Sequence, residues 1–302
     1  MHLFLTLFLG YGVYKNLKVI AIFHNDTYLN IYRIILLTIM DEILEKQLFE
    51  KYEFLRPTQD RSIVEKNMEI MAKQMPDEKI KGLEDMEESL GNKGLISDSL
   101  KEYKNKHDPE IYGEEIEPIN DLMVFGMQCD NGWYNLLDEL FYNIQNHLEK
   151  HPELKKNFKI EEVKEKYGTL RVYYYGGDDY IDKLVTQAEK KSGNICEVCG
   201  AKGKLCTTAY DIAFINNSFY KVPSENNGWY KTLCKADAEK LHYMYDKEKI
   251  SDSEAYRILV KRKAENDDTL ANRDTYSDEY IEYAEKENRK IEKYLDILKK
   301  RL

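Results

Sequence analysis

The clearest pattern along the chain is a helical one near its middle. Apolar residues recur at steps of three and four between residues 133 and 148, as in a helix that buries one broad face. These residues are Trp133, Leu137, Leu140, Phe141, Ile144 and Leu148. Asp130 or Asn131 can cap this helix, and His151-Pro152 ends it because a residue before proline avoids the helical conformation. The pattern therefore predicts one amphipathic helix.

A strand and a second helix are predicted next. Residues 159–168 are interpreted as a loop, and residues 170–175 alternate as in a strand with one inward face. The inward residues are Leu170, Val172 and Tyr174, and the outward residues are Arg171, Tyr173 and Tyr175. The helix should begin at Asp178 or Asp179. Its inward residues are Ile181, Leu184, Val185 and Ala188. Two acids before an apolar-periodic run are typical helix caps, so we assign them no catalytic role.

Helical patterns also occur on both sides of this region. Residues 41–52 and 63–75 have amphipathic patterns, so residues 41–117 are interpreted as a helical arm followed by a linker. Near the other end, apolar steps of three and four with one polar position form a seam like that of a coiled coil. The seam consists of Ile281, Ala284, Asn288, Ile291, Leu295, Leu298 and Leu302. Its partner is either the preceding helix, folded back as a hairpin, or another copy of the chain.

Residues 1–40 are more apolar than the rest of the chain. Charged residues interrupt every window of about 20 residues, so no membrane-spanning helix is predicted. No basic residue precedes the apolar run and no small-residue cleavage site follows it, as a secretory signal requires. Three interpretations remain open: a buried strand or helix pair, a weak membrane-surface anchor, and an extension upstream of a start at Met40.

The charge of the chain favours a protein partner over nucleic acid. The chain carries 55 acidic and 45 basic residues, a net charge of −10, whereas nucleic-acid-binding domains usually present a basic face. A local basic and aromatic patch is nevertheless predicted around the strand, where it could stack and neutralise single-stranded nucleic acid. The residues of this patch are Lys164, Lys166, Arg171, Tyr173 and Tyr175.

Metal chemistry is concentrated in a cysteine cluster. Four of the five cysteines fall within 39 residues, which suits a metal site in a reducing compartment better than a disulfide framework. Cys196 and Cys199 form a Cys-x-x-Cys-Gly knuckle, and Cys234 lies where a short strand should meet a helix. A knuckle, a hairpin and a helix whose first turn supplies ligands form a treble-clef arrangement, so Zn2+ is the predicted cofactor.

The spacing leaves the fourth ligand open. Asp237 lies one helical turn after Cys234, but structural zinc sites are usually completed by Cys or His. Cys206 is therefore placed slightly ahead of Asp237, with His242 third. Four protein ligands leave no position for a substrate, so the metal is expected to stabilise the fold, with an apparent binding free energy of roughly 10 to 16 kcal/mol.

Both tryptophans of the chain lie in an Asn-Gly-Trp-Tyr tetrapeptide. In both places Asn-Gly is expected to turn the chain and to deliver an aromatic pair into the core. Trp133 and Trp229 are therefore interpreted as buried anchors of one lobe. A helix follows the first segment and a strand follows the second, so the two are not a tandem repeat.

These motifs resemble those of a group of short, largely uncharacterised bacteriophage and prophage proteins. The segments that carry the resemblance are “GWYNLLDEL”, “VKEKYGTLRVYY”, “CEVCGAKGKL” and “GWYKTLC”, all within residues 126–242. The chain departs from the pattern at Asp237, where the group usually has the partner residue of a second Cys-x-x-Cys or Cys-x-x-His motif. It also has a longer segment after the knuckle. The resemblance implies a phage context and a host-directed function, and it brings no enzymatic activity.

Other catalytic patterns are weak. His147 and His151 lie four residues apart, but the order His-Leu-Glu-Lys-His lacks the His-Glu pair of a metallopeptidase helix. The sequence contains no Walker loop, no dinucleotide-binding glycine turn and no Gly-x-Ser-x-Gly motif. No residue is therefore assigned a catalytic role.

The sequence predicts an α+β protein in four parts. These are an apolar segment at 1–40, a helical arm and linker at 41–117, a zinc-binding core at 118–250 and a C-terminal helical hairpin at 251–302. The expected function is non-enzymatic: a phage-encoded protein of the host cytoplasm that forms a homo-oligomer and inhibits a host protein complex, such as an anti-phage defence complex. Nucleic acid and membrane are not expected as main partners. A single-stranded nucleic-acid-binding zinc protein and a metal-dependent hydrolase that uses the two histidines are the alternatives.

Overall fold

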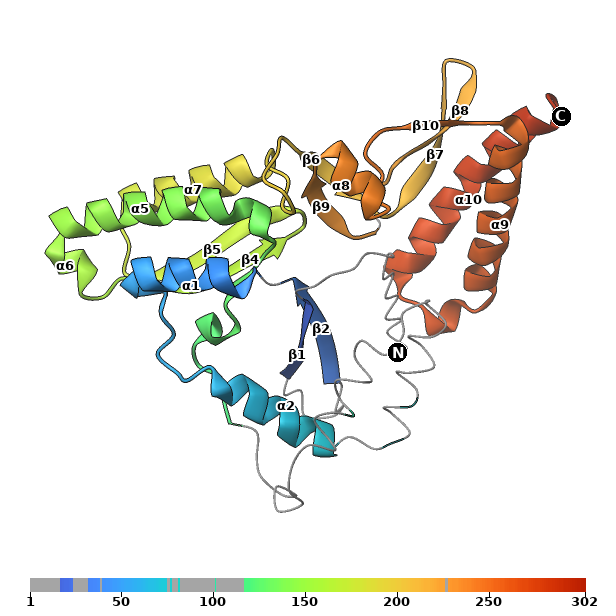
Figure 1. The fold of residues 1–302 in the computed structure, drawn as a ribbon. Helices are drawn as coiled ribbons and strands as arrows, with labels where there is room; N and C mark the ends of the chain where they lie inside the picture. The colour runs from blue at the N-terminus through green and yellow to red at the C-terminus, as the bar shows by residue number, and fades with distance from the viewer. Residues whose placement is uncertain are drawn as a thin grey trace. The chain divides into compact units, whose positions relative to one another are not determined.

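The computed structural model describes residues 17–23, 32–38, 40–74, 117–225 and 228–302, together with Asp77, Lys81 and Lys101. The protein is of mixed α/β type, and its chain divides into two compact units (Figure 1). Of the described residues, the core unit comprises those from 17 to 206 and 230–242, and the C-terminal unit comprises those from 207 to 229 and 243–302. Most of the predicted linker lies outside the described residues.

A three-stranded sheet in the order β3-β4-β5 lies at the centre of the core unit. Its strands are β3 (Met127–Gln128), β4 (Lys159–Lys166) and β5 (Thr169–Tyr175). Strand β3 runs parallel to β4, and β4 pairs antiparallel with β5 so that Val163 faces Val172. Tyr167 and Gly168 join β4 to β5 with φ values of 54° and 76°. Two such residues give the tight turn that matches the twist of a hairpin.

Two helices, α5 (Tyr134–Lys150) and α7 (Asp179–Ser192), pack side by side over this sheet (Figure 1). The predicted inward residues of α5 are all buried. The Asp178 carboxylate accepts hydrogen bonds from the backbone N–H groups of Tyr180 and Ile181, which confirms it as the cap of α7. The two predicted helices and the predicted strand at β5 are thus confirmed.

The predicted cap of α5 is wrong. A short 3-10 turn, η4 (Asn131–Trp133), precedes the helix, and Asp130 makes no capping hydrogen bond. The Asn131 side chain instead accepts a hydrogen bond from the backbone of Asp41 at 2.7 Å. The polar side chains at this helix start therefore join segments that are distant in the sequence, which a local pattern does not reveal.

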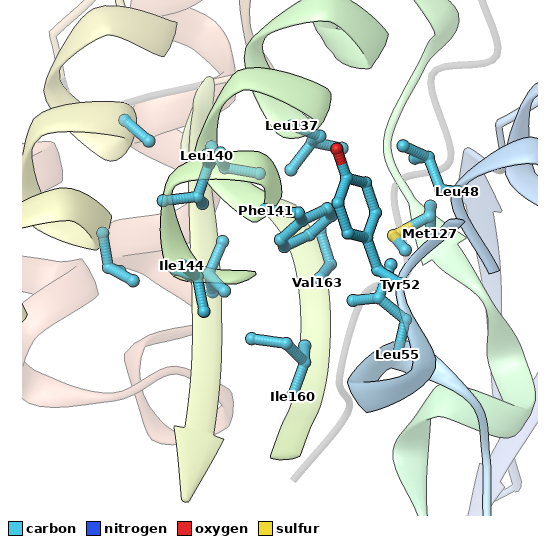
Figure 2. Packing of buried hydrophobic residues seen from close by; sticks show 14 of the residues in the cluster. Leu48, Tyr52, Leu55, Met127, Leu137, Leu140, Phe141, Ile144, Ile160 and Val163 are labelled. Atoms are coloured by element: carbon cyan, nitrogen blue, oxygen red, sulfur yellow. The ribbon is translucent and has the colours of Figure 1, made fainter. Parts of the chain in front are cut away.

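Helix α1 (Glu42–Lys51) belongs to the core and does not form a separate arm. Leu48 and Tyr52 are fully buried, and the Tyr52 ring meets the Phe141 ring edge-on with 5.7 Å between centroids (Figure 2). The Tyr52 hydroxyl donates a hydrogen bond to Asp138 Oδ1 at 2.7 Å. The expectation of an arm is wrong for this helix because its apolar side chains pack on α5.

The core unit also contains further elements. They include the strand pair β1 (Leu17–Phe23) and β2 (Tyr32–Thr38), the helices α2 (Ser62–Gln74) and α6 (Pro152–Lys155), and the turns η1 (Glu53–Leu55) and η3 (Leu122–Phe125). Strands β1 and β2 pair antiparallel, so residues 1–40 contain a strand pair, and its burial stays a prediction, as do the other two interpretations. Among the described residues, no helix combines the length and the apolar character that crossing a bilayer requires.

The C-terminal unit packs a small antiparallel sheet against two helices. Its sheet has the order β10-β8-β7, and the helices α9 and α10 are joined by the turn η5. The elements are β7 (Tyr210–Ile215), β8 (Ser218–Pro223), β10 (Glu248–Ile250), α9 (Asp252–Ala271), η5 (Arg273–Thr275) and α10 (Asp278–Lys299).

The seam of α10 is filled within the chain. Its buried residues Ile291, Leu295 and Leu298 share one hydrophobic cluster with Leu259 of α9 and Phe219 of β8. The hairpin alternative is therefore correct, and the seam gives no argument for the expected homo-oligomer. The strand pair at residues 210–223 also belongs to this unit and not to the expected core at 118–250, because its apolar face packs on the seam.

Candidate metal centre

Three cysteines and one aspartate come together in the part of the core unit that follows α7. Cys196 and Cys199 lie in the loop after α7, in a turn where Gly200 has a φ of 77°. Strands β6 (Lys204–Thr207) and β9 (Tyr230–Leu233) form a two-stranded sheet, and β9 leads into helix α8 (Lys235–Lys240). The Cys234 thiol caps α8 by accepting a hydrogen bond from the backbone N–H of Asp237 at 3.4 Å.

The four donor atoms are close enough together to share one metal ion. They all lie within 4.8 Å of one another. The Sγ atoms of Cys199 and Cys234 are 3.7 Å apart, and Asp237 Oδ2 is 3.1 Å from Cys234 Sγ. Zinc bonds of about 2.3 Å to sulfur and about 2.1 Å to oxygen place the sulfurs of a tetrahedron about 3.8 Å apart, and sulfur and oxygen about 3.6 Å apart. The Cys199 and Cys234 sulfurs match this spacing, and the group as a whole, with all its donors within 4.8 Å, is compatible with a metal ion such as zinc.

The thiols and the carboxylate are electrostatically coupled. Burial raises the pKa of the Cys196 thiol, and burial with the hydrogen bond to Asp237 raises the pKa of Cys199 to about 12. Burial opposes the charge on Asp237, but hydrogen bonds from the three thiols hold its pKa below the ordinary value. A divalent cation can take the place of thiol protons beside such a carboxylate, because thiolates are the metal-binding form.

Asp237 completes the group, and Cys206 does not belong to it. The sequence favours Cys206 slightly over Asp237 as the fourth ligand, but the Cys206 thiol is buried on β6 and donates to the carbonyl oxygen of Lys204 at 3.3 Å. His242 also lies outside the group, after the end of α8 at a φ of 58°. Asp237 is favoured by helix geometry, because one turn of α8 brings its carboxylate back to the Cys234 thiol.

The first Asn-Gly-Trp segment docks the knuckle onto the core. The backbone N–H of Gly132 donates to the carbonyl oxygen of Glu197 at 2.7 Å, and Trp133 Nε1 donates to the carbonyl oxygen of Ile195 at 2.9 Å. A Cβ at Gly132 would lie only 2.2 Å from the carbonyl oxygen of Cys196. The glycine of this motif is therefore required by the close approach of the knuckle backbone.

A buried charged cluster joins the same segments. Lys231 Nζ lies 2.9 Å from Asp130 Oδ2 and 3.0 Å from Glu197 Oε2. Burial opposes the charge on Lys231, but the two carboxylates hold its pKa well above the ordinary value. Burial raises the pKa of Glu197 to about 7, and Lys231 offsets this only in part. The lysine thus bridges β9, the knuckle and the segment before α5.

Sequence analysis did not identify this cluster. The available signal was a lysine within the strand pattern of “YKTL” and a glutamate between the two cysteines of “CEVC”. The local sequence predicts that both side chains face solvent, whereas they are buried.

Trp229 is 58 % exposed, so the expectation that it is a core anchor is wrong. Trp133 is fully buried, as predicted. Gly228, just before Trp229, has a φ of 93°, and residues 226–227 of the expected turn lie outside the described residues. The backbone N–H of Thr208 donates to the carbonyl oxygen of Trp229, and the backbone N–H of Trp229 donates to the Thr208 hydroxyl. These hydrogen bonds fix the backbone and leave the indole exposed to solvent.

The two histidines of the hydrolase alternative take no part in the metal-type group. His147 Nε2 lies 2.8 Å from Asp178 Oδ2 and its ring stacks on Tyr180, while His151 Nδ1 lies 3.1 Å from Glu153. Within the described part of the chain, the Cys and Asp group is the one set of three or more metal-type side chains whose donors lie this close. The histidine positions therefore lend no support to a metal-dependent hydrolase.

Comparisons of the chain with protein-family models, with curated proteins and with solved structures found no match. The function must therefore be inferred from the chemistry of the residues.

Proposed function

We propose that this chain is a phage-encoded, zinc-stabilised binding protein that inhibits a host protein complex. The observation that carries the proposal is the convergence of Cys196, Cys199, Cys234 and Asp237 within 4.8 Å. In this proposal a single Zn2+ ion joins the knuckle to the start of α8 in a treble-clef-like lobe. The ion stabilises the lobe and takes no part in a reaction.

The donor set supports a structural role. Three cysteines and one aspartate supply the four ligands of a tetrahedral ion, whereas catalytic zinc sites keep one position for water or substrate. Cys196, the first cysteine of the docked knuckle, is fully buried, so one thiolate of the set is out of reach of bulk solvent. A site of this kind acts by fixing the backbone around it.

The metal assignment has a direct test with a matched control. We expect one zinc per chain in the wild type and in Cys206→Ser, because the Cys206 thiol lies outside the group. Asp237→Ala should lower the affinity for zinc by more than about tenfold, since it removes a ligand. Elemental analysis and competition with a chromophoric chelator measure both. Loss of zinc in Cys206→Ser with full retention in Asp237→Ala would contradict this ligand set.

The protein partner is proposed from the exposed tryptophan and the phage resemblance. Trp229 is 58 % exposed although its backbone is held on both sides by Thr208. Tryptophan is the side chain most enriched among the residues that dominate binding energy at protein interfaces. A rigidly presented, solvent-facing indole is therefore suited to anchor a protein partner.

Affinity capture from host bacteria tests this part. The zinc-loaded protein should retain one stoichiometric protein complex and inhibit the activity of that complex. Trp229→Ala should weaken the capture by at least about tenfold, as expected for a central aromatic anchor. If neither the wild type nor Trp229→Ala retained a stoichiometric complex from the lysate, the proposed partner class would be refuted, whatever the zinc content.

A further inference from the structure

The face of the β4-β5 sheet opposite α5 and α7 is polar, basic and aromatic. Val163 and Val172 are buried on the helix-covered side. On the other side the register pairs Lys164 with Arg171. Tyr173 and Tyr175 follow Arg171 along β5 at two-residue intervals, so their side chains lie on this same face.

The tyrosines of this face are exposed. Tyr173 is 41 % exposed and Tyr175 is 67 % exposed, and Tyr167 in the adjoining turn is 71 % exposed. Positions two apart on a strand are separated by about 7 Å. The two strand tyrosines thus offer two neighbouring aromatic surfaces on a rigid element, at a spacing that lets each take one planar ligand group.

Cations flank these rings. Lys164 Nζ lies 5.2 Å from the centre of the Tyr173 ring, and Lys166 Nζ lies 5.8 Å from that of Tyr167. Arg171 donates through one nitrogen to Thr169 Oγ1 and to the carbonyl oxygen of Leu170. Guanidinium carries five donor hydrogens, so most of its donor capacity remains for a ligand.

The local charge differs in sign from that of the chain. Lys164, Lys166 and Arg171 are three cations on this face, and its acids are Glu162, at 2.6 Å from Lys164 Nζ, and the exposed Glu161, which the bulge turns to the same side. The whole chain has a net charge of −10. A cationic face on an acidic protein is complementary to a polyanion, because the rest of the surface repels one.

The edge of β5 is closed to a protein strand. The backbone N–H of Leu170 donates to Ser192 Oγ at 2.9 Å, and that of Val172 donates to Glu189 Oε1 at 3.2 Å. Side chains of α7 therefore occupy the donors that an added strand would need. The ligand has to approach the face of the sheet and not its edge.

We propose that this face binds single-stranded nucleic acid, with bases stacked on Tyr173 and Tyr175 and phosphates held by Arg171 and Lys166. Stacking on aromatic side chains beside basic residues is the general chemistry of sequence-tolerant single-strand binding. This activity goes beyond the protein partner proposed above and does not depend on it.

Fluorescence anisotropy with the zinc-loaded full chain tests the proposal. The probes are labelled 12-residue oligo(dT) and oligo(U), which separate DNA from RNA, with a duplex and an abasic strand of equal length as controls. We expect at least one single strand to bind at low salt and to weaken as salt rises. Tyr173→Ala with Tyr175→Ala should reduce its affinity by about tenfold or more, because each stacked base contributes roughly 1–3 kcal/mol.

Two further variants make the outcome decisive. Tyr142→Ala removes a tyrosine that is 55 % exposed on α5 and should leave binding unchanged. Glu162→Gln should tighten binding severalfold, because it releases Lys164 from its carboxylate. Equal binding of the abasic strand or the duplex, no change in the double tyrosine variant, or no binding to either single strand would each overturn the proposal.

Discussion

Replacement of Gly132 by alanine should uncouple the knuckle from the core. The added Cβ would lie 2.2 Å from the carbonyl oxygen of Cys196, and 2.5 Å from both the carbonyl oxygen of Glu197 and the backbone nitrogen of Gly200. All three are backbone atoms, so no side chain can rotate away and the whole turn that carries Cys196 and Cys199 has to move.

The expected magnitude follows from two effects. Overpacking of a closed site costs about 1–3 kcal/mol. Displacement of the turn also breaks the hydrogen bond from Gly132 N to Glu197 O, which contributes about 0.5–1.5 kcal/mol. Their sum, about 2–4 kcal/mol, corresponds to a roughly 30- to 1000-fold loss of zinc affinity if the strain acts on the bound state.

Gly193→Ala is the matched control. Gly193 follows α7 at a φ of −64°, and a Cβ there would meet its nearest neighbours at 3.6 and 3.7 Å, which is ordinary contact. Zinc affinity is measured by chelator competition, and stability by urea unfolding of the zinc-loaded protein. If Gly132→Ala kept zinc affinity within about threefold of the control, the knuckle would not be docked as described.

Three other changes test interactions within the core unit and the C-terminal unit. Lys231→Met should destabilise the core unit by up to about 3–5 kcal/mol in urea unfolding, because two carboxylates lose the cation buried between them. Leu298→Ala should destabilise the C-terminal unit by about 2–5 kcal/mol and leave the zinc content unchanged. Burial opposes the charge on Asp121, but hydrogen bonds from a lysine, a threonine and the backbone hold its pKa below the ordinary value of 3.8. Its contribution to stability is therefore complete above that value and is lost as the pH falls through the lower folded-state pKa; Asp121→Asn should flatten a series of urea midpoints taken against pH.

Elements with an uninterrupted local period were predictable from the sequence. Helix α5 has six buried residues in one stripe, and β5 has a regular alternation of more and less buried residues. Each element can therefore be predicted from residues that are close in the sequence. The cysteine knuckle was recognisable because only two residues separate its two cysteines. These features required no knowledge of what packs against them.

Strand β4 was missed because a bulge interrupts its period. Its buried residues Ile160 and Val163 are three apart, and the pairing register shifts between Ile160 and Glu162. A period of two therefore breaks within a strand of eight residues, and the charged side chains around it resemble a loop. The alternation of more and less buried residues in β4 is present, but the bulge divides it into two short runs.

Long-range partners explain the other differences. Asp130 was expected to cap a helix, yet it binds a lysine 101 residues away. Trp229 was expected to be buried because it repeats the context of Trp133, yet only the first segment faces the knuckle backbone. The fourth ligand was ranked by chemical preference, whereas the turn of α8 brings Asp237 to the Cys234 thiol. The first two outcomes depend on tertiary contacts that a tetrapeptide cannot encode, whereas the third is a local contact within one helical turn that the spacing already offered.

The knuckle is attached to the core mainly by polar contacts. Of the described knuckle residues 195–200, Ile195 alone joins the main hydrophobic cluster, and it does so only in part. The other attachments are backbone hydrogen bonds, such as that from Glu197 N to Thr232 O at 2.8 Å, and the bridge through Lys231. Hydrogen bonds of this kind contribute about 1 kcal/mol each, whereas a structural zinc ion contributes roughly 10 to 16 kcal/mol. The ion should therefore determine whether the knuckle and α8 keep their arrangement, while the sheet face of β5 rests on an apolar core that does not require it.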